Sequence, residues 1–135
     1  MSDSRSNKDV VLEYYELAYV QGKPDEAAER FLGPSYVQHD PQTPDGKDPF
    51  ITTAAGEPIG GTVEVKRVLA EGEMVVVHSH LRDVDPALLG LGPEADRERG
   101  VAIMNVYRVE DGRIVEHWDV FQPVPEQPAN DNTMF

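Results

Sequence analysis

Residues 101–121 are the stretch that best predicts the fold, and they read VAIMNVYRVEDGRIVEHWDVF. Two runs in which apolar and polar residues alternate, 101–109 and 113–121, have the period of two that β-strands require. They flank Glu110-Asp111-Gly112, a sequence typical of a tight hairpin turn. The sequence therefore predicts an antiparallel β-hairpin here.

The register of this hairpin decides which of its side chains share one face. The loop can hold two or three residues. With three, and Gly112 in the left-handed conformation, Asn105 pairs with His117 and Ile103 with Asp119. One face then carries Ile103, Asn105, Tyr107, His117, Asp119 and Phe121. Polar groups among large apolar ones are typical of a small-molecule pocket, whereas a two-residue loop would break up the grouping.

A second hairpin is predicted upstream, with strands over residues 62–70 and 74–82 around Glu71-Gly72-Glu73. Residues 83–99 separate the two hairpins and are rich in proline, glycine and charge, yet they contain three leucines. We interpret this segment as a loop that docks its leucines on the core. A pocket lid or a dimer contact is the alternative.

The first half of the chain has the periodicity of helices. Helices are predicted over residues 7–21, 24–32 and 50–55, with a short strand over residues 36–39. Ser6 with Asp9 resembles a capping box, and Gly22 sits where a C-cap belongs. Helices followed by a run of antiparallel strands predict an α+β fold, with the helices packed on one face of a curved sheet.

Length and composition predict one domain over residues 1–135, with a core at about 8–122 and a proline-rich extended tail at 123–135. The chain has no cysteine, which excludes disulfides and fits a reducing compartment. Its formal net charge of −13 disfavours nucleic acids and anionic membranes as partners. No apolar run reaches membrane-spanning length. We expect a soluble, cytoplasmic protein.

Asp119 is the candidate general base. A carboxylate between Trp118 and Val120 and close to Phe121 is expected to be partly desolvated, which raises a carboxyl pKa toward the range useful for a base. The alternative is an ordinary surface aspartate at a strand end.

The histidines and tyrosines supply further candidates. His39, His78, His80 and His117 are all of the histidines in the chain. Imidazoles suit zinc or iron, but no pair has the spacing of a helical metal site, so we predict pocket walls and no metal. Tyr14 and Tyr15 face about 100° apart on a helix, so at most one points fully into a pocket.

Three segments resemble those of SnoaL-like proteins, which belong to the nuclear-transport-factor-2-like superfamily. The segments are Tyr36-Val37-Gln38-His39-Asp40-Pro41, Asp45-Gly46-Lys47 and residues 107–119. The resemblance covers about residues 8–122 and implies a cystatin-like cone, in which three N-terminal helices pack on a strongly curved, mainly antiparallel sheet. The end of the chain, residues 130–135, is similar to a bacterial subgroup of proposed aldol-condensation enzymes or cyclases.

The resemblance also implies roles for single residues. Asp119 matches the general base of the polyketide cyclases, which need neither metal nor cofactor, and His39 matches a histidine that faces the pocket. Similarity to ketosteroid isomerase implies Asp40 as an alternative base and Tyr15 as a donor to the oxyanion. Asn105 then stands where that enzyme has a protonated aspartate.

The function that follows is cofactor-free acid–base chemistry next to a carbonyl group, either an aldol-type cyclisation or an isomerisation. The catalytic candidates are Asp119, His39, Asp40 and His117, and the substrate-binding candidates are Tyr15, His78, His80, Asn105, Tyr107 and Phe121. The expected ligand is small, apolar and contains a carbonyl group. The alternatives are a non-catalytic binding or carrier module, and a dimeric scaffold with a vestigial pocket. A homodimer is expected in each case.

Overall fold

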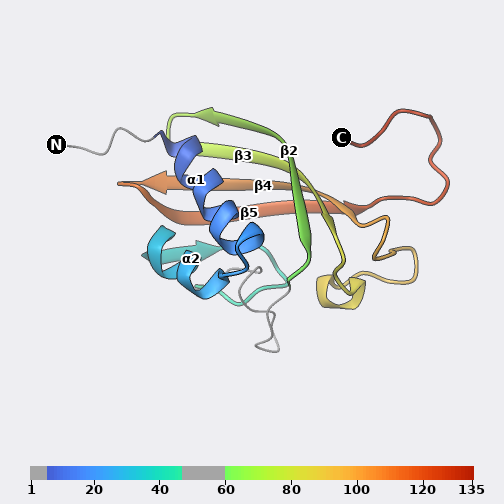
Figure 1. Ribbon diagram of the computed structural model, residues 1–135, viewed down its shortest axis with the longest axis horizontal. Coiled ribbons are helices and arrows are strands. Elements are labelled where there is room, and N and C mark those ends of the chain that lie inside the picture. The colour runs from blue at the N-terminus through green and yellow to red at the C-terminus, as the bar shows by residue number, and fades with distance from the viewer. Residues whose placement is uncertain (1–5, 47–59) are drawn as a thin grey trace.

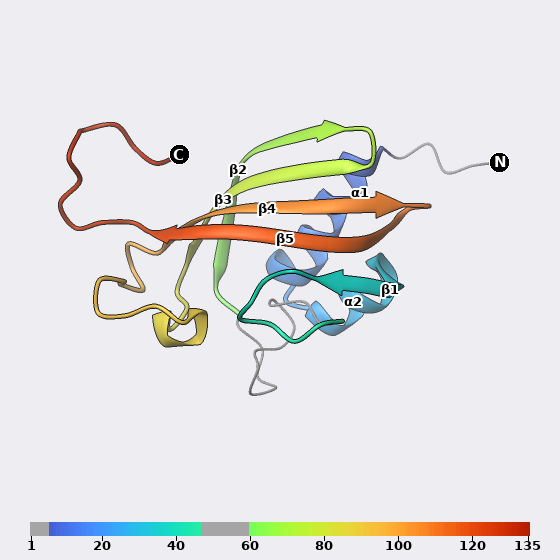
Figure 2. The ribbon, with the colours of Figure 1, turned by 180° about the vertical axis from the view of Figure 1, so that it is seen from behind.

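The computed structural model describes residues 6–46 and 60–135. Its elements are α1 (Asn7–Tyr15), a π-helical segment (Glu16–Val20), α2 (Pro24–Phe31), β1 (Leu32–Gln38), β2 (Thr62–Glu71), β3 (Met74–Arg82), a 3-10 turn (Pro86–Leu89), β4 (Val101–Glu110) and β5 (Arg113–Pro123). The helices cover one face of the sheet, as the two opposite views show (Figures 1 and 2). The predicted helix at 50–55 lies outside the described residues.

The sheet has five strands in the order β1-β5-β4-β3-β2. Strand β1 runs parallel to β5, and every other neighbouring pair is antiparallel. Figure 2 shows β1 beside β5 at one edge, with β2 at the other. The predicted α+β fold with a mainly antiparallel sheet is confirmed. We call the face toward the helices the concave face and the opposite face the outer face.

The first helix begins where the sequence predicts. Ser6 accepts a hydrogen bond from the Asp9 backbone N–H and Asp9 accepts one from the Ser6 backbone N–H, which is the predicted capping box. After Tyr15 the helix widens into a π-helical turn, in which Gln21 N–H donates to the carbonyl of Glu16 at 3.0 Å. This widened turn changes which side chains of the segment face the sheet.

Strand β1 is longer than predicted. It begins at Leu32 and includes Gly33 and Pro34, which the sequence places at the end of a helix. Proline is tolerated here because β1 is an edge strand of the sheet.

The β4–β5 hairpin has a two-residue loop, so the predicted three-residue loop is wrong. Glu110 pairs with Arg113, and Asp111 and Gly112 both have positive φ, 52° and 75°. That combination is the type I′ geometry, which matches the twist of the flanking strands.

A bulge restores the predicted face. The pairing shifts by one between Arg108 and Val109, which leaves Val115 as the extra residue on β5. Beyond it the pairs are Tyr107 with His117, Asn105 with Asp119 and Ile103 with Phe121. The six predicted residues therefore share a face after all, through a different local structure. Gly33 leaves room for the bulge, because a Cβ there would lie 3.0 Å from Val115 Cγ1.

Two apolar clusters form the core. The larger lies between the helices and the concave face and includes Val11, Tyr14, Phe31, Tyr107 and Ile114. The smaller includes Leu81, Val84, Leu89, Val101 and Ile103. Since Leu89 belongs to the 83–99 segment, the second cluster supports the interpretation that this loop docks a leucine on the core.

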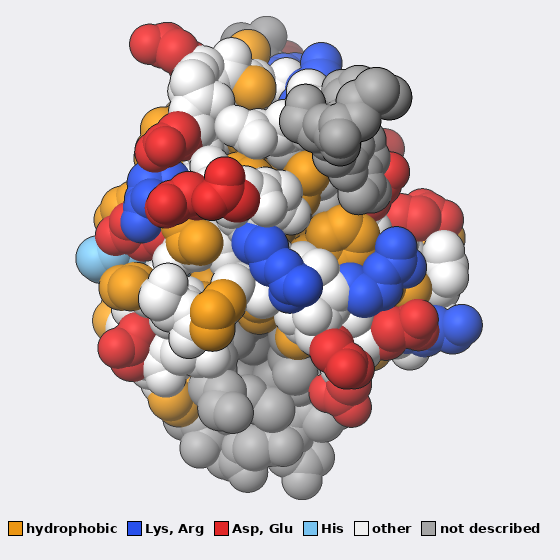
Figure 3. All heavy atoms as spheres, turned by 90° about the vertical axis from the view of Figure 1, so that its left-hand side faces the viewer, with side chains coloured by type: hydrophobic (Ala, Val, Ile, Leu, Met, Phe, Trp, Pro, Cys, Tyr) orange, Lys and Arg blue, Asp and Glu red, His pale blue; other side chains and the backbone are white. Residues whose placement is uncertain are grey.

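The surface at the turn end of the sheet is mixed in charge. Figure 3 shows acidic and basic side chains interspersed there. Near the β4–β5 turn, the Arg108 guanidinium lies 2.9 Å from a Glu116 carboxylate oxygen and 3.0 Å from one of Glu110.

Candidate active site on the concave face

A cluster of buried polar side chains lies on the concave face, and we call it the concave-face cluster. Its members are Tyr15 from α1, Gln38 from β1, Asn105 and Tyr107 from β4, and His117 and Asp119 from β5. Sequence reasoning found five of these six residues. The five strand residues come together because strand alternation and the Val115 bulge place them on one side of three adjacent strands, and Tyr15 meets them from α1.

His117 is fully buried and held by two amide side chains. Its Nδ1 lies 2.8 Å from Gln38 Oε1, and its Nε2 lies 2.8 Å from the Asn105 amide. Burial, followed by the positive charge of His39, lowers the pKa of His117 to about 3. The ring is therefore neutral at physiological pH.

The hydrogen-bond partners fix the tautomer of this neutral ring. Gln38 Oε1 already accepts the backbone N–H of Asp40 at 2.9 Å, so it can only accept from His117, and Nδ1 carries the proton. Nε2 then has a lone pair toward Asn105. The Asn105 amide lies between this nitrogen and the Tyr15 hydroxyl, 2.8 Å from each.

The orientation of the Asn105 amide therefore reports the charge of His117. The structure has Asn105 Oδ1 at His117 Nε2, with Asn105 Nδ2 donating to the Tyr15 hydroxyl, an orientation that pairs with an imidazolium. A neutral ring protonated at Nδ1 needs the amide turned by 180°, with its NH2 group at Nε2 and its carbonyl at Tyr15. The Tyr15 hydroxyl also lies 2.9 Å from that of Tyr107. One hydrogen-bonded chain thus runs from Tyr107 to Gln38 through the buried core.

Asp119 lies next to this chain. Its side chain is 6% exposed, and one carboxylate oxygen is 4.0 Å from His117 Nε2. Across the strand pair it faces Asn105. The arrangement places a proton acceptor beside groups that can donate hydrogen bonds, which is what proton transfer next to a carbonyl requires.

A cleft between the helical segment 12–20 and β2 touches the cluster at Tyr15 and is not lined by Asp119, Asn105 or His117. It has a volume of about 430 Å³ and is lined by Leu12, Tyr15, Glu16, Tyr19, Val20, Val63, Glu64 and Val65. Most of these side chains are apolar, and the volume lies in the range of small-molecule pockets. Tyr15 belongs both to this cleft and to the concave-face cluster. The π-helical turn forms one wall, and such turns occur frequently at functional sites.

The prediction that His39 shares a cavity with Asp119 is wrong. The His39 ring stacks on Trp118 at 4.8 Å and 3°, and its Nε2 lies 2.7 Å from a Glu116 carboxylate oxygen. Because strand side chains alternate, Gln38 takes the inward position and His39 the outer one.

Asp40 is buried, and its carboxylate stabilises the turn that follows β1. One of its carboxylate oxygens accepts the backbone N–H of Gln42 at 2.8 Å, and its own N–H donates to Gln38. It touches the cluster only through Gln38. Its role as an alternative base stays a prediction.

His78 and His80 lie on the outer face, so they do not join the cluster. The inward positions of β3 belong to Val75, Val77, Ser79 and Leu81. Phe121, by contrast, pairs with Ile103 on the concave side and packs on the smaller core cluster. Within residues 6–46 and 60–135, no three histidine or acidic side chains are grouped so that they could hold a metal ion.

Gln38 and Ser79 are the polar residues that sequence reasoning missed. Both are buried on the concave face. Strand alternation was the available signal, because Gln38 is two residues from the buried Tyr36 and Ser79 lies between Val77 and Leu81.

Solved structures with similar folds define the class of protein. A nuclear-transport-factor-2-like protein of unknown function from Cytophaga hutchinsonii is 18% identical with a TM-score of 0.65, over 91% of this chain and 96% of that one. A proposed SnoaL-like polyketide cyclase from Jannaschia is 19% identical with a TM-score of 0.62, over 94% and 100%. A proposed polyketide cyclase from Acidithiobacillus ferrooxidans is 18% identical with a TM-score of 0.59, over 90% and 91%. The fold is nuclear-transport-factor-2-like.

The family follows from the sequence itself. The SnoaL-like domain matches residues 11–117, so the chain belongs to the SnoaL-like family. No curated protein matches the sequence. In the described part of the chain, no helix is both long enough and apolar enough to cross a membrane.

Proposed function

We propose that the concave-face cluster carries out cofactor-free acid–base chemistry next to the carbonyl group of a small apolar ligand. The observation that carries this proposal is the nearly buried Asp119 carboxylate, 4.0 Å from His117 and paired across the strands with Asn105. Membership of the SnoaL-like family and similarity to proposed polyketide cyclases support the choice of an aldol-type cyclisation or an isomerisation.

Each residue has a definite task in this reaction. Asp119 removes a proton from the carbon next to the carbonyl, and the electron pair of that C–H bond moves into the enolate. We assign Tyr15 and Asn105 as donors to the enolate oxygen, a role in which each exchanges a hydrogen bond within the cluster for one to the ligand. One such donor is worth about 2.7–4 kcal/mol in related sites. Neutral His117 keeps the Asn105 amide in position.

The enolate then has two possible fates, and both return the proton. In a cyclisation its carbon attacks a second carbonyl of the same molecule, a C–C bond forms, and the new alkoxide takes the proton from Asp119. In an isomerisation the proton returns at another carbon. Neither route needs an oxidant, a reductant or a second substrate.

Proton exchange tests the proposal without knowledge of the natural substrate. A panel of small cyclic and aromatic ketones in D2O would be followed by NMR for deuterium uptake at the carbon next to the carbonyl. Asp119→Asn keeps the shape but removes the base, so uptake should fall by about two or more orders of magnitude, with ligand affinity nearly unchanged. Glu116→Gln, on the same strand but off the concave face, is the matched control.

The outcomes separate the competing assignments. Unchanged uptake in Asp119→Asn together with loss in Asp40→Asn would move the base to Asp40. Ligand binding without deuterium uptake in the unmodified chain would favour a binding or carrier module. One feature of the cluster favours that second function, since its polar groups are engaged with one another. No uptake and no binding would leave the scaffold interpretation.

We also propose that the outer face mediates a homodimer. Leu69, Met104 and Val120 are 61%, 37% and 70% exposed on this face, and a symmetric pairing of two copies would bury them. Light scattering at micromolar concentration should give about twice the monomer mass of 15.0 kDa. Val120→Glu should shift the mass to that of one chain. A monomer mass for the unmodified protein would contradict the proposal.

A further inference from the structure

The chain beyond β5 folds back onto the outer face of the sheet. Its first residue is fixed to the loop before β4, because Val124 N–H donates to the Gly100 carbonyl at 3.0 Å and Arg99 Nε donates to the Val124 carbonyl at 3.1 Å. The segment then leaves the body of the protein and returns, so that the C-terminus lies beside the sheet (Figure 1). We call residues 124–135 the tail.

The last residue of the tail makes the principal contact. The Phe135 ring stacks on His80 with a centroid distance of 4.2 Å and on His78 at 5.6 Å. Lys66 Nζ lies 5.4 Å from the centroid of the same ring. Two imidazoles and an ammonium group thus surround one aromatic ring, and both kinds of contact are favourable for it.

The two imidazoles are held in place by neighbouring groups. His80 Nε2 donates to the Arg99 carbonyl at 2.7 Å. Arg99 therefore contacts both Val124, where the tail begins, and the ring on which Phe135 stacks. His78 Nδ1 contacts the guanidinium of Arg67, and the same ring hydrogen-bonds with the backbone of Met134. The contacts with Arg99 and Arg67 are made by residues outside the tail, so they hold the two rings in place before Phe135 docks.

Local turns keep the end of the tail compact. Asn132 N–H donates to Asn130 Oδ1 at 2.9 Å, and Phe135 N–H donates to Thr133 Oγ1 at 3.2 Å. Such side-chain to backbone bonds lower the number of conformations open to a short segment.

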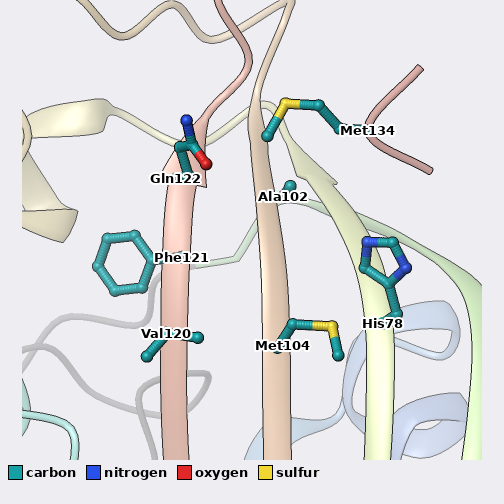
Figure 4. Close-up of a pocket in the computed structure, with 7 residues that line it drawn as sticks. All are labelled: His78, Ala102, Met104, Val120, Phe121, Gln122 and Met134. Atoms are coloured by element: carbon teal, nitrogen blue, oxygen red, sulfur yellow. The ribbon is translucent and has the colours of Figure 1, made fainter. Parts of the chain in front are cut away.

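A cavity of about 280 Å³ lies between the tail and the sheet. Figure 4 shows its walls, which include His78, Ala102, Met104 and Val120 from the sheet and Met134 from the tail. Met134 is the one wall residue that the docked tail contributes. Movement of the tail would remove this wall.

We propose that His78, His80 and Lys66 form a docking site for Phe135 of the same chain, and that docking supplies Met134 as one wall of the outer-face cavity. The tail is thus a C-terminal segment that binds to a site on the outer face of its own sheet. This inference does not depend on the chemistry proposed for the concave face.

Backbone relaxation of the 135-residue chain tests the docking. The order parameters of residues 130–135 should match those of β5, about 0.85, and should fall below about 0.6 in Phe135→Ala. His80→Ala, which alters the receptor instead of the tip, should have the same effect. Met134→Leu keeps the ring contact and should leave the tail ordered. The Met104 methyl resonance should shift in the first two variants, because the cavity loses a wall.

Three results would overturn the inference. The first is a mobile tail in the unmodified protein, and the second is a tail that stays ordered in both Phe135→Ala and His80→Ala. The third is a nuclear Overhauser contact between Phe135 and His80 that joins different molecules in a mixture of labelled and unlabelled protein, since the tail would then dock on a second copy. All of the altered side chains lie outside the two core clusters, so each variant should fold.

Discussion

Acidification should destabilise this protein through His117. Its pKa is about 3 in the folded state and 6.5 in the unfolded chain, because burial disfavours the imidazolium. Between pH 6.5 and pH 3 the imidazole is protonated in the unfolded state and mostly unprotonated in the native state. The free energy of unfolding therefore decreases as the pH is lowered through this range. Each pKa unit of difference is worth 1.36 kcal/mol, which gives a loss of about 3 kcal/mol at pH 4 and about 4 kcal/mol at pH 3.

Urea unfolding of the wild type and of His117→Gln between pH 7.5 and pH 4 would measure this loss. Carboxylates titrate in the same range, but they do so in both proteins. The difference between the two unfolding free energies therefore isolates the imidazole. The glutamine variant is expected to be less stable than the wild type at pH 7.5. The difference between their free energies of unfolding should become much smaller as the pH is lowered to 4.

Parallel curves would refute the reasoning. They would mean that His117 carries its proton in the native state, paired with Asp119, and that the Asn105 amide points its carbonyl at the ring. The acid–base roles in the concave-face cluster would then need to be reassigned.

Two further substitutions test the packing and the network. Gly100→Ala should destabilise by more than about 3 kcal/mol in thermal or urea unfolding, because φ is +73° and the new Cβ would lie 2.2 Å from the Leu81 carbonyl oxygen. Gly72→Ala, with φ +57° and open space around it, is the control and should cost only about 1–2 kcal/mol. Tyr15→Phe removes two buried hydrogen bonds, so it should cost about 1–3 kcal/mol and also slow deuterium uptake by bound ketones; equal stability to the wild type would contradict the network.

The sequence predicts the elements of this fold well because their signals are local. The capping box at Ser6 and the alternation in the two hairpins depend on residues a few positions apart. The predictions that are wrong concern residues whose orientation depends on pairing with a neighbouring strand. His39 is assigned to the wrong face because that assignment rests on the family resemblance, whereas in the structure Gln38 pairs with His117 of β5 and takes the buried position.

The length of the β4–β5 loop is a second feature that the local sequence does not determine. Glu110-Asp111-Gly112 fits a loop of two or of three residues, and the choice cannot be made without the bulge. A signal for the bulge was present, because Ile114 and Val115 are consecutive apolar residues and both are buried. A regular strand would expose one of them.

The Val115 bulge makes the site sensitive to chain length in a way that ordinary substitutions do not reveal. Loss of one residue between Gly112 and Glu116 would leave every side chain after it chemically intact, yet His117 and Asp119 would exchange faces with Trp118 and Val120. In a sequence alignment, a gap placed one position too far along β5 would match residues of the concave face with residues of the outer face. Comparison of this strand with that of a relative should therefore start from the bulge, and only then match Asp119 with the acid of the other protein.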